Sequence, residues 1–274
     1  MKNDINNVYL FLVLILILTW LFWIPAGFIA RADRPIAVAV LHYTGGAMPF
    51  LLTLFYLALR SSANERAQFL ERIIDLKRIK FPFWIVIFIT IPFLTMLSAG
   101  LSLLADKAIG APLQFSIASE KWFSIIPMAL FLLVFGPLPE EIAWRGYALD
   151  KMLKIDSPFR ASLVLGFYWI VWHLPLFFIE GSYQYSLGWG SLRFWMFMLD
   201  KIPLTFMMTW IFLHSRNSTL SAILFHFIVN YFGELVDMRQ STEIIFISLL
   251  WLSAVGIFLF EKKIWLLKPA SEKR

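Results

Sequence analysis

The chain has 274 residues, of which 60% are hydrophobic and 15% are charged, and it contains no cysteine. Soluble domains are roughly 45–50% apolar and about 25% charged, so this composition excludes a water-soluble globule and, for the same reason, a disordered chain. The lack of cysteine excludes disulfides, thiolate metal sites and cysteine nucleophiles. The formal net charge of +6 suits contact with an anionic membrane leaflet and requires no nucleic-acid partner.

Eight apolar runs along the sequence predict transmembrane helices. A helix needs about 20 mostly apolar residues to cross a bilayer, and these runs lack the ~10-residue alternating pattern of membrane barrel strands. The runs are approximately Val8–Ala30, Ala37–Leu59, Phe81–Ala105, Trp122–Leu138, Phe159–Ile179, Phe194–Leu213, Leu220–Val236 and Ile244–Phe260. We therefore expect an all-α, polytopic integral membrane protein with about eight transmembrane helices, forming a single membrane domain over residues 1–274.

The basic residues indicate how these helices are oriented. With the N-terminus inside, 17 of the 24 Lys and Arg residues fall in cytoplasmic segments and 6 fall in external ones. Because short cytoplasmic loops carry an excess of Lys and Arg, we expect a multi-pass protein of the cell membrane with both termini in the cytoplasm.

The segment Ser61–Lys80 is too polar to cross a membrane. In a helix, Phe69, Ile73 and Leu76 would share one face, and basic residues surround that face. This pattern predicts an amphipathic helix lying in the membrane interface. The alternative is an ordinary solvated connector.

The first polar motif in an apolar setting is the segment from Gly136 to Tyr147, which contains Glu140, Glu141 and Arg145. Proline before the acidic pair suits a helix start, where the helix dipole favours carboxylates. Neighbouring helical residues diverge by about 100°, so Glu141 can pair with Arg145 four residues later while Glu140 faces another site. An unpaired carboxylate in an apolar setting suits a general base. The alternative is an acidic pair at the membrane surface with a routine ion pair.

Two further motifs place histidines within predicted spans. His173 follows Trp169 by one helical turn, and Pro175 disturbs the helix just beyond it. His226 and Asn230 are spaced i, i+4, so both project from one face of a helix that Asn217 or Ser218 caps. The alternative for His173 is a buried histidine that is hydrogen-bonded to a backbone carbonyl. The alternative for His226 and Asn230 is a pair that only forms hydrogen bonds between helices. Together with the acidic pair, however, these residues make a sensible set for hydrolysis by an activated water.

These motifs, in this order, resemble those of the CAAX-protease and bacteriocin-processing (CPBP or Abi) family of intramembrane glutamic endopeptidases. The family pattern is read here as Glu140-Glu141-x-x-x-Arg145, Trp169-x-x-x-His173 and His226-x-x-x-Asn230. Many members carry Phe where this chain has Trp169. The resemblance covers a motif-bearing core of about residues 122–232, and it implies an all-α, eight-helix membrane fold.

The resemblance also implies roles for the residues of the motifs. Glu140 and His173 would activate a water for peptide hydrolysis, and His226 and Asn230 would bind the oxyanion. Glu141 and Arg145 would support the site. The implied activity is cleavage of a hydrophobic or lipidated, membrane-associated peptide, with membrane lipid as the surrounding partner and without nucleic acid.

Metal use and other functions stay open at this stage. The resemblance favours a glutamate-type mechanism without a metal or other cofactor. Glu140, His173 and His226 are the set that would bind zinc if one were used, because catalytic zinc often takes histidine and carboxylate ligands. A non-catalytic membrane immunity or regulatory partner is one alternative function. A proton-coupled transporter is another, since intramembrane carboxylate–histidine sets also form proton relays.

Overall fold

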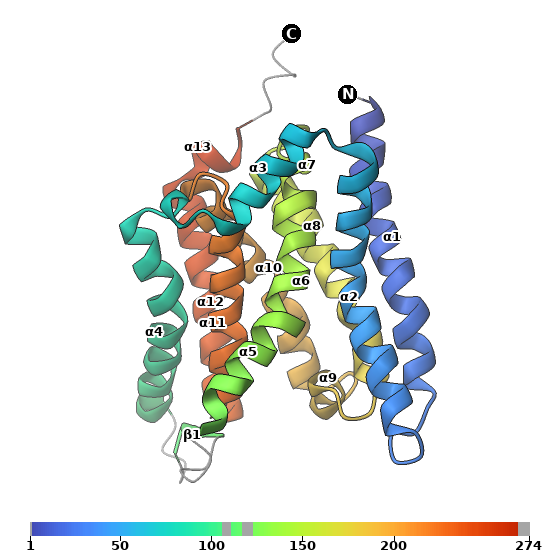
Figure 1. The fold of residues 1–274 in the computed structure, drawn as a ribbon. Helices are drawn as coiled ribbons and strands as arrows, with labels where there is room; N and C mark the ends of the chain where they lie inside the picture. Colours follow the sequence, from blue (N-terminus) through green and yellow to red (C-terminus); the bar gives the residue numbers. More distant parts are fainter. Residues whose placement is uncertain (1, 106–110, 117–122, 268–274) are drawn as a thin grey trace.

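The computed structural model describes residues 2–105, 111–116 and 123–267, which form a bundle of helices (Figure 1). The elements in chain order are α1 (Lys2–Gly27), α2 (Pro35–Arg60), α3 (Ala63–Ile74), η1 (Leu76–Arg78), α4 (Phe81–Ala105), β1 (Leu113–Phe115), α5 (Ile125–Phe135), α6 (Pro137–Glu141), η3 (Ile142–Leu149), α7 (Asp150–Met152), α8 (Pro158–His173), η4 (Leu174–Phe178), α9 (Tyr183–Leu187), α10 (Leu192–His214), α11 (Thr219–Leu235), β2 (Val236–Met238), α12 (Gln240–Phe260) and α13 (Lys262–Trp265). The predicted all-α architecture is confirmed.

Seven segments within the described residues are long and apolar enough to cross a membrane, and the eighth predicted run forms the shorter apolar helix α11 of 17 residues. At 1.5 Å per residue α11 is about 25 Å long, a little less than the ~30 Å hydrocarbon thickness. Each of the eight predicted apolar runs therefore corresponds to a helix, and the chain is a multi-pass membrane protein.

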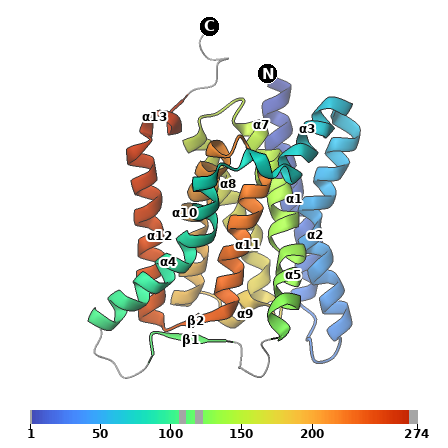
Figure 2. The same cartoon turned by 60° about the vertical axis from the view of Figure 1, so that its left-hand side comes forward.

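The two ends of the bundle carry different elements. The first turn of α1 lies at the same end as α3, α7 and α13, whereas β1 and α9 lie at the opposite end (Figure 1). The cytoplasmic location of the termini stays a prediction. At the end that carries α9, β1 and β2 pair antiparallel, with Gln114 opposite Asp237 (Figure 2). This short ribbon is a small departure from the all-helical expectation.

The helix that carries the acidic pair differs most from the prediction. Residues Ile125–Met152 form one candidate span of 28 residues, so the predicted end of the span at Leu138 is wrong. The backbone breaks at Gly136, resumes in α6 with Pro137 at the first position, and winds as a π-helix through η3. Glu140 consequently lies past the middle of the span, inside the bundle, and not at a membrane surface.

The amphipathic segment forms α3 and the short helix η1 at one end of the bundle (Figure 1). Ser62 and Glu65 form a reciprocal capping box at its start. Phe69 is buried, whereas Leu70 and Ile74 are exposed, which fits a helix with one face on the protein and one in the interface. Arg72 binds the carboxylate of Asp150 in α7 and the carbonyl of Gly146 in η3.

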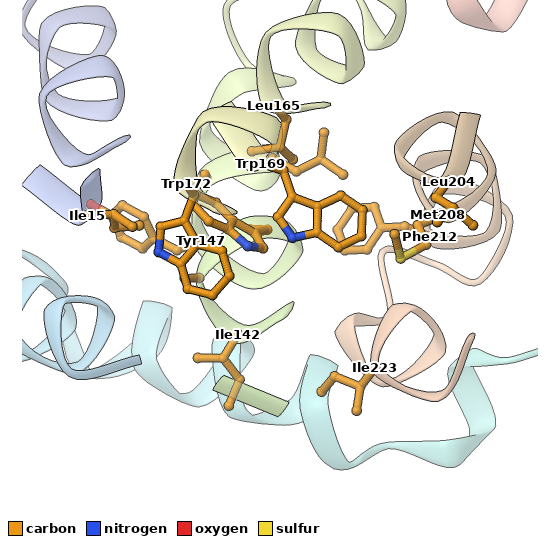
Figure 3. Packing of buried hydrophobic residues seen from close by; sticks show 14 of the residues in the cluster. Ile15, Ile142, Tyr147, Leu165, Trp169, Trp172, Leu204, Met208, Phe212 and Ile223 are labelled. Atoms are coloured by element: carbon orange, nitrogen blue, oxygen red, sulfur yellow. The ribbon is translucent and has the colours of Figure 1, made fainter. Parts of the chain in front are cut away.

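The hydrophobic core joins α1, α8, α10, α11 and η3 around large aromatic side chains. Figure 3 shows Trp169 and Trp172 of α8 lying between Ile15 on one side and Phe212 on the other. The indole N–H of Trp172 donates to the hydroxyl of Thr19 over 2.9 Å, which ties α8 to α1. The core therefore fixes the face of α8 that carries the second predicted motif.

Candidate active site

The carboxylate of Glu140 is held from one side. The Glu140 residue is 8% exposed, and its Oε2 accepts a hydrogen bond from the indole Nε1–H of Trp169, with 2.7 Å between N and O. Trp169 is itself only 2% exposed and is packed into the core, so the donor has a fixed position. The described residues offer Oε1 of Glu140 no hydrogen-bond partner. One oxygen is thus anchored while the other is available to a ligand.

Both predicted imidazoles contact the same indole ring. The ring centroids of Trp169 and His226 are 5.1 Å apart, and those of Trp169 and His173 are 5.8 Å apart. Glu140 comes from α6, His173 from the end of α8 and His226 from α11. Three side chains that are distant in sequence therefore meet around Trp169 inside the bundle.

The tautomer of His173 follows from its hydrogen bond. His173 ends α8, and its Nδ1 lies 2.7 Å from the carbonyl oxygen of Trp169. A carbonyl can only accept, so Nδ1 carries the proton, and Nε2 of the neutral ring is left as an acceptor. The bond to a backbone carbonyl that the sequence offered as an alternative is present, and it leaves Nε2 of His173 able to accept a proton.

Glu141 is the centre of a second, fully buried network. Its Oε1 accepts from the guanidinium of Arg145 and from Nδ1 of His226, each over 2.8 Å. Both Glu141 and Arg145 have side chains that are 0% exposed, so the predicted i, i+4 pair exists but lies in the interior. Arg145 also donates to the hydroxyl of Thr205 over 3.2 Å and lies over the Trp169 ring. The network joins α6, η3, α10 and α11.

Asn230 lies beside the backbone break at Gly136, between α5 and α6. It lies one turn after His226 on α11, which Ser218 caps by accepting from the N–H of Ser221. A Cβ built on Gly136 would stand 3.3 Å from Nδ2 of Asn230 and 3.0 Å from the carbonyl of Leu132. The missing side chain at Gly136 is therefore what lets the amide of Asn230 approach the start of α6.

Comparison with known proteins identifies the family of this chain. A family model described as "Type II CAAX prenyl endopeptidase Rce1-like" matches residues 122–232. The chain is also 31% identical over 261 residues to the CAAX prenyl protease 2 of Methanococcus maripaludis, an alignment that covers 94% of this chain and 96% of the relative. The chain belongs to the Rce1-like CAAX prenyl endopeptidase family. The family resemblance read from the motifs is thus confirmed, and the chain is a membrane-embedded member of a family of peptidases.

The segment that matches the Rce1-like family model contains every candidate site residue that the sequence indicated, from Glu140 to Asn230. It also contains Asp200 and Lys201 on α10, which sequence reasoning did not select. Nζ of Lys201 lies 5.3 Å from the centroid of the Trp169 ring. The signal was present, because a lysine in the middle of an apolar run is rare and calls for a partner.

The alternative zinc set of this Rce1-like chain is not assembled as a metal centre. Within residues 2–105, 111–116 and 123–267, no three His, Asp or Glu side chains are grouped so as to hold a metal ion. The predicted absence of a metal from the reaction stays a prediction, for which chelation is the test.

Proposed function

We propose that this protein is an intramembrane endopeptidase in which Glu140 and His173 activate a water molecule. The observation that carries the proposal is the anchored carboxylate of Glu140, with the rings of His173 and His226 on the indole that holds it. As substrate we propose a lipidated, membrane-associated peptide of the prenylated CAAX type, because the matching family and the Methanococcus maripaludis relative are named for it.

In the proposed mechanism, Oε1 of Glu140 and Nε2 of His173 accept hydrogen bonds from one water molecule. Trp169 keeps Oε2 of Glu140 in place, so the carboxylate need not reorganise during the reaction. As the water oxygen bonds to the peptide carbonyl carbon, Glu140 takes one of its protons. The proton then passes to the leaving amide nitrogen, the carbon–nitrogen bond breaks, and a carboxylic acid and an amine result.

The developing oxyanion needs donors on its other side. Nε2 of His226 and Nδ2 of Asn230 are the groups we assign to it. His226 donates through Nε2 only when its ring carries both protons, and the carboxylate of Glu141 on Nδ1 balances the charge of that form. Arg145 holds Glu141 in turn. Glu141 and Arg145 thus set the orientation of His226 without touching the substrate.

Cleavage of a fluorogenic prenylated CAAX peptide by the purified protein in detergent or vesicles tests this proposal. Glu140→Gln, His173→Ala and His226→Ala should each lower kcat by at least about 100-fold while the protein remains folded. His42→Ala is the matched control, because His42 lies on α2 and its ring packs against Trp23 and Tyr43, neither of which is assigned to the site.

Other outcomes distinguish the competing functions. Full biological activity in all three site variants would favour a non-catalytic partner role. Loss of solute or ion uptake, without any cleavage by the wild type, would favour transport. Cleavage that survives in Glu140→Gln would remove Glu140 from the mechanism even if the peptidase function held.

A further inference from the structure

An ion pair buried in the membrane span of α10 is unused by the proposed mechanism. Nζ of Lys201 lies 2.6 Å from Oδ1 of Asp200, and the side chains are 7% and 20% exposed. Isolated charges in the bilayer interior are expensive, and such a pair on adjacent residues does nothing for helix formation. Helix stability therefore does not explain why a charged pair lies in this position.

The pair lies at the edge of the candidate active site. Nζ of Lys201 is 3.6 Å from the centroid of the Phe197 ring and 5.3 Å from that of Trp169. Phe197 in turn packs edge-on against His173, with centroids 5.2 Å apart, and lies 6.1 Å from the ring of the exposed Tyr183. The ammonium thus sits between the protein surface at α9 and the residues assigned to water activation.

The Asp200–Lys201 pair has hydrogen-bond donors and an acceptor that the described residues do not satisfy. An ammonium has three donors, and Asp200 is the sole hydrogen-bond acceptor that the described residues provide to Lys201. Oδ2 of Asp200 has no partner there either, and the Asp200 side chain is partly exposed. The pair is electrically neutral as a whole, so it presents both donors and acceptors without adding net charge.

A peptide that enters an intramembrane cavity needs hydrogen-bond partners for its backbone. Each of its backbone N–H and C=O groups loses water on entry, and an unsatisfied amide group in an apolar setting is costly. We propose that the Asp200–Lys201 pair binds the main chain of the substrate next to the scissile bond. Lys201 donates to a peptide carbonyl and Asp200 accepts from a peptide N–H. The pair thereby sets which bond reaches Glu140. This inference rests on the proposed endopeptidase function.

Kinetics with backbone-modified peptides test the assignment. The probe is the fluorogenic prenylated CAAX peptide, with each amide near the cleaved bond N-methylated in turn. In the wild type, one of these changes should raise KM by about tenfold, because it removes the N–H that Asp200 accepts. In Asp200→Asn the same N-methyl group should raise KM by less than about threefold, because the acceptor is already weakened.

Lysine variants complete the design. Lys201→Met should raise KM for the unmodified peptide by about tenfold and change kcat by less than about threefold. Lys262→Met is the matched control on an exposed lysine of α13. If Lys201→Met proves unstable, the double variant Asp200→Asn/Lys201→Met removes both charges together, and it should raise KM for the unmodified peptide by at least about tenfold.

Three results would overturn the assignment. One is an equal effect of every N-methyl group in wild type and Asp200→Asn. Another is a loss in kcat alone, which would mean that Lys201 acts on the catalytic residues. The third is that Lys201→Met raises KM for the free-acid peptide but not for the amidated one. That result would mean that Lys201 binds the peptide's terminal carboxylate. Failure of the wild type to cleave any peptide would instead refute the proposed function itself.

Discussion

The Glu141–Arg145 pair offers a quantitative test of how the buried network is held together. Glu141→Gln would leave the guanidinium of Arg145 at 0% exposure without its carboxylate, and arginine cannot shed its proton. Removing one partner of a buried ion pair costs about 3–5 kcal/mol. We expect that loss in the free energy of unfolding, because the hydroxyl of Thr205 is the one other side-chain hydrogen-bond partner that the described residues give Arg145.

The opposite change should be milder. In Arg145→Met the carboxylate of Glu141 keeps the hydrogen bond from Nδ1 of His226, so we expect a loss of about 1.5–3 kcal/mol. The double variant Glu141→Gln/Arg145→Met buries no unpaired charge and should unfold within about 1 kcal/mol of the wild type. It should nevertheless lose at least about tenfold in kcat, because His226 no longer faces a carboxylate.

Unfolding in mixed micelles, followed by circular dichroism, gives these free energies, and peptide cleavage gives kcat. Arg160→Met is the matched control: Arg160 pairs with Asp156 at the same i, i+4 spacing, but its side chain is 69% exposed, so the loss should be at most about 1 kcal/mol. A double variant that is no more stable than Glu141→Gln would refute the view that an uncompensated buried charge dominates.

Three further predictions concern two contacts of the site and the use of a metal. Trp169→Phe keeps an aromatic ring beside both histidines but removes the donor to Glu140, so kcat for the peptide should fall roughly 10- to 100-fold; an unchanged kcat would show that this bond is dispensable. Gly136→Ala puts a methyl group 3.3 Å from Nδ2 of Asn230, so it should lower kcat. Because this effect acts through Asn230, the double variant Gly136→Ala/Asn230→Ala should have the same kcat as Asn230→Ala alone. Treatment with 1,10-phenanthroline should leave cleavage at the level seen with a non-chelating isomer, whereas a selective loss that added zinc restores would contradict the metal-free mechanism.

Much of the fold could be predicted from the sequence, because few backbone conformations are stable in lipid. A long apolar run must form a helix to satisfy its own hydrogen bonds, and each predicted run did so. The Glu141–Arg145 pair followed from local spacing alone. So did a helix cap at Asn217 or Ser218, and the structure shows that Ser218 is the cap. Local rules of this kind need no knowledge of which helices touch.

The remaining features depend on contacts between distant segments. The π-helical η3 has no sequence period of its own, so the end of its span was misplaced at Leu138. The hydrogen bond from Trp169 to Glu140 joins two helices whose relative rotation the sequence does not contain. The position of the Asn230 amide could not be predicted either, because it depends on the lack of a side chain at Gly136 on another helix. Lys201 was visible in the sequence, but its place beside Trp169 was not.

The π-helical stretch η3 bears on how length changes in this helix would act. All eight of its residues, Ile142–Leu149, are buried, and π-helical hydrogen bonds reach one residue further than α-helical ones. A π-helix turns less per residue than an α-helix, so regular α-helical winding over the same eight residues would turn one half of the helix against the other by on the order of 100°. Either the acidic pair would rotate away from Trp169, or Asp150 would rotate away from Arg72. Deleting one residue would largely cancel that rotation, because one α-helical residue itself turns by about 100°. The wide turn thus accommodates one extra residue and keeps two separate sets of contacts in phase along one helix.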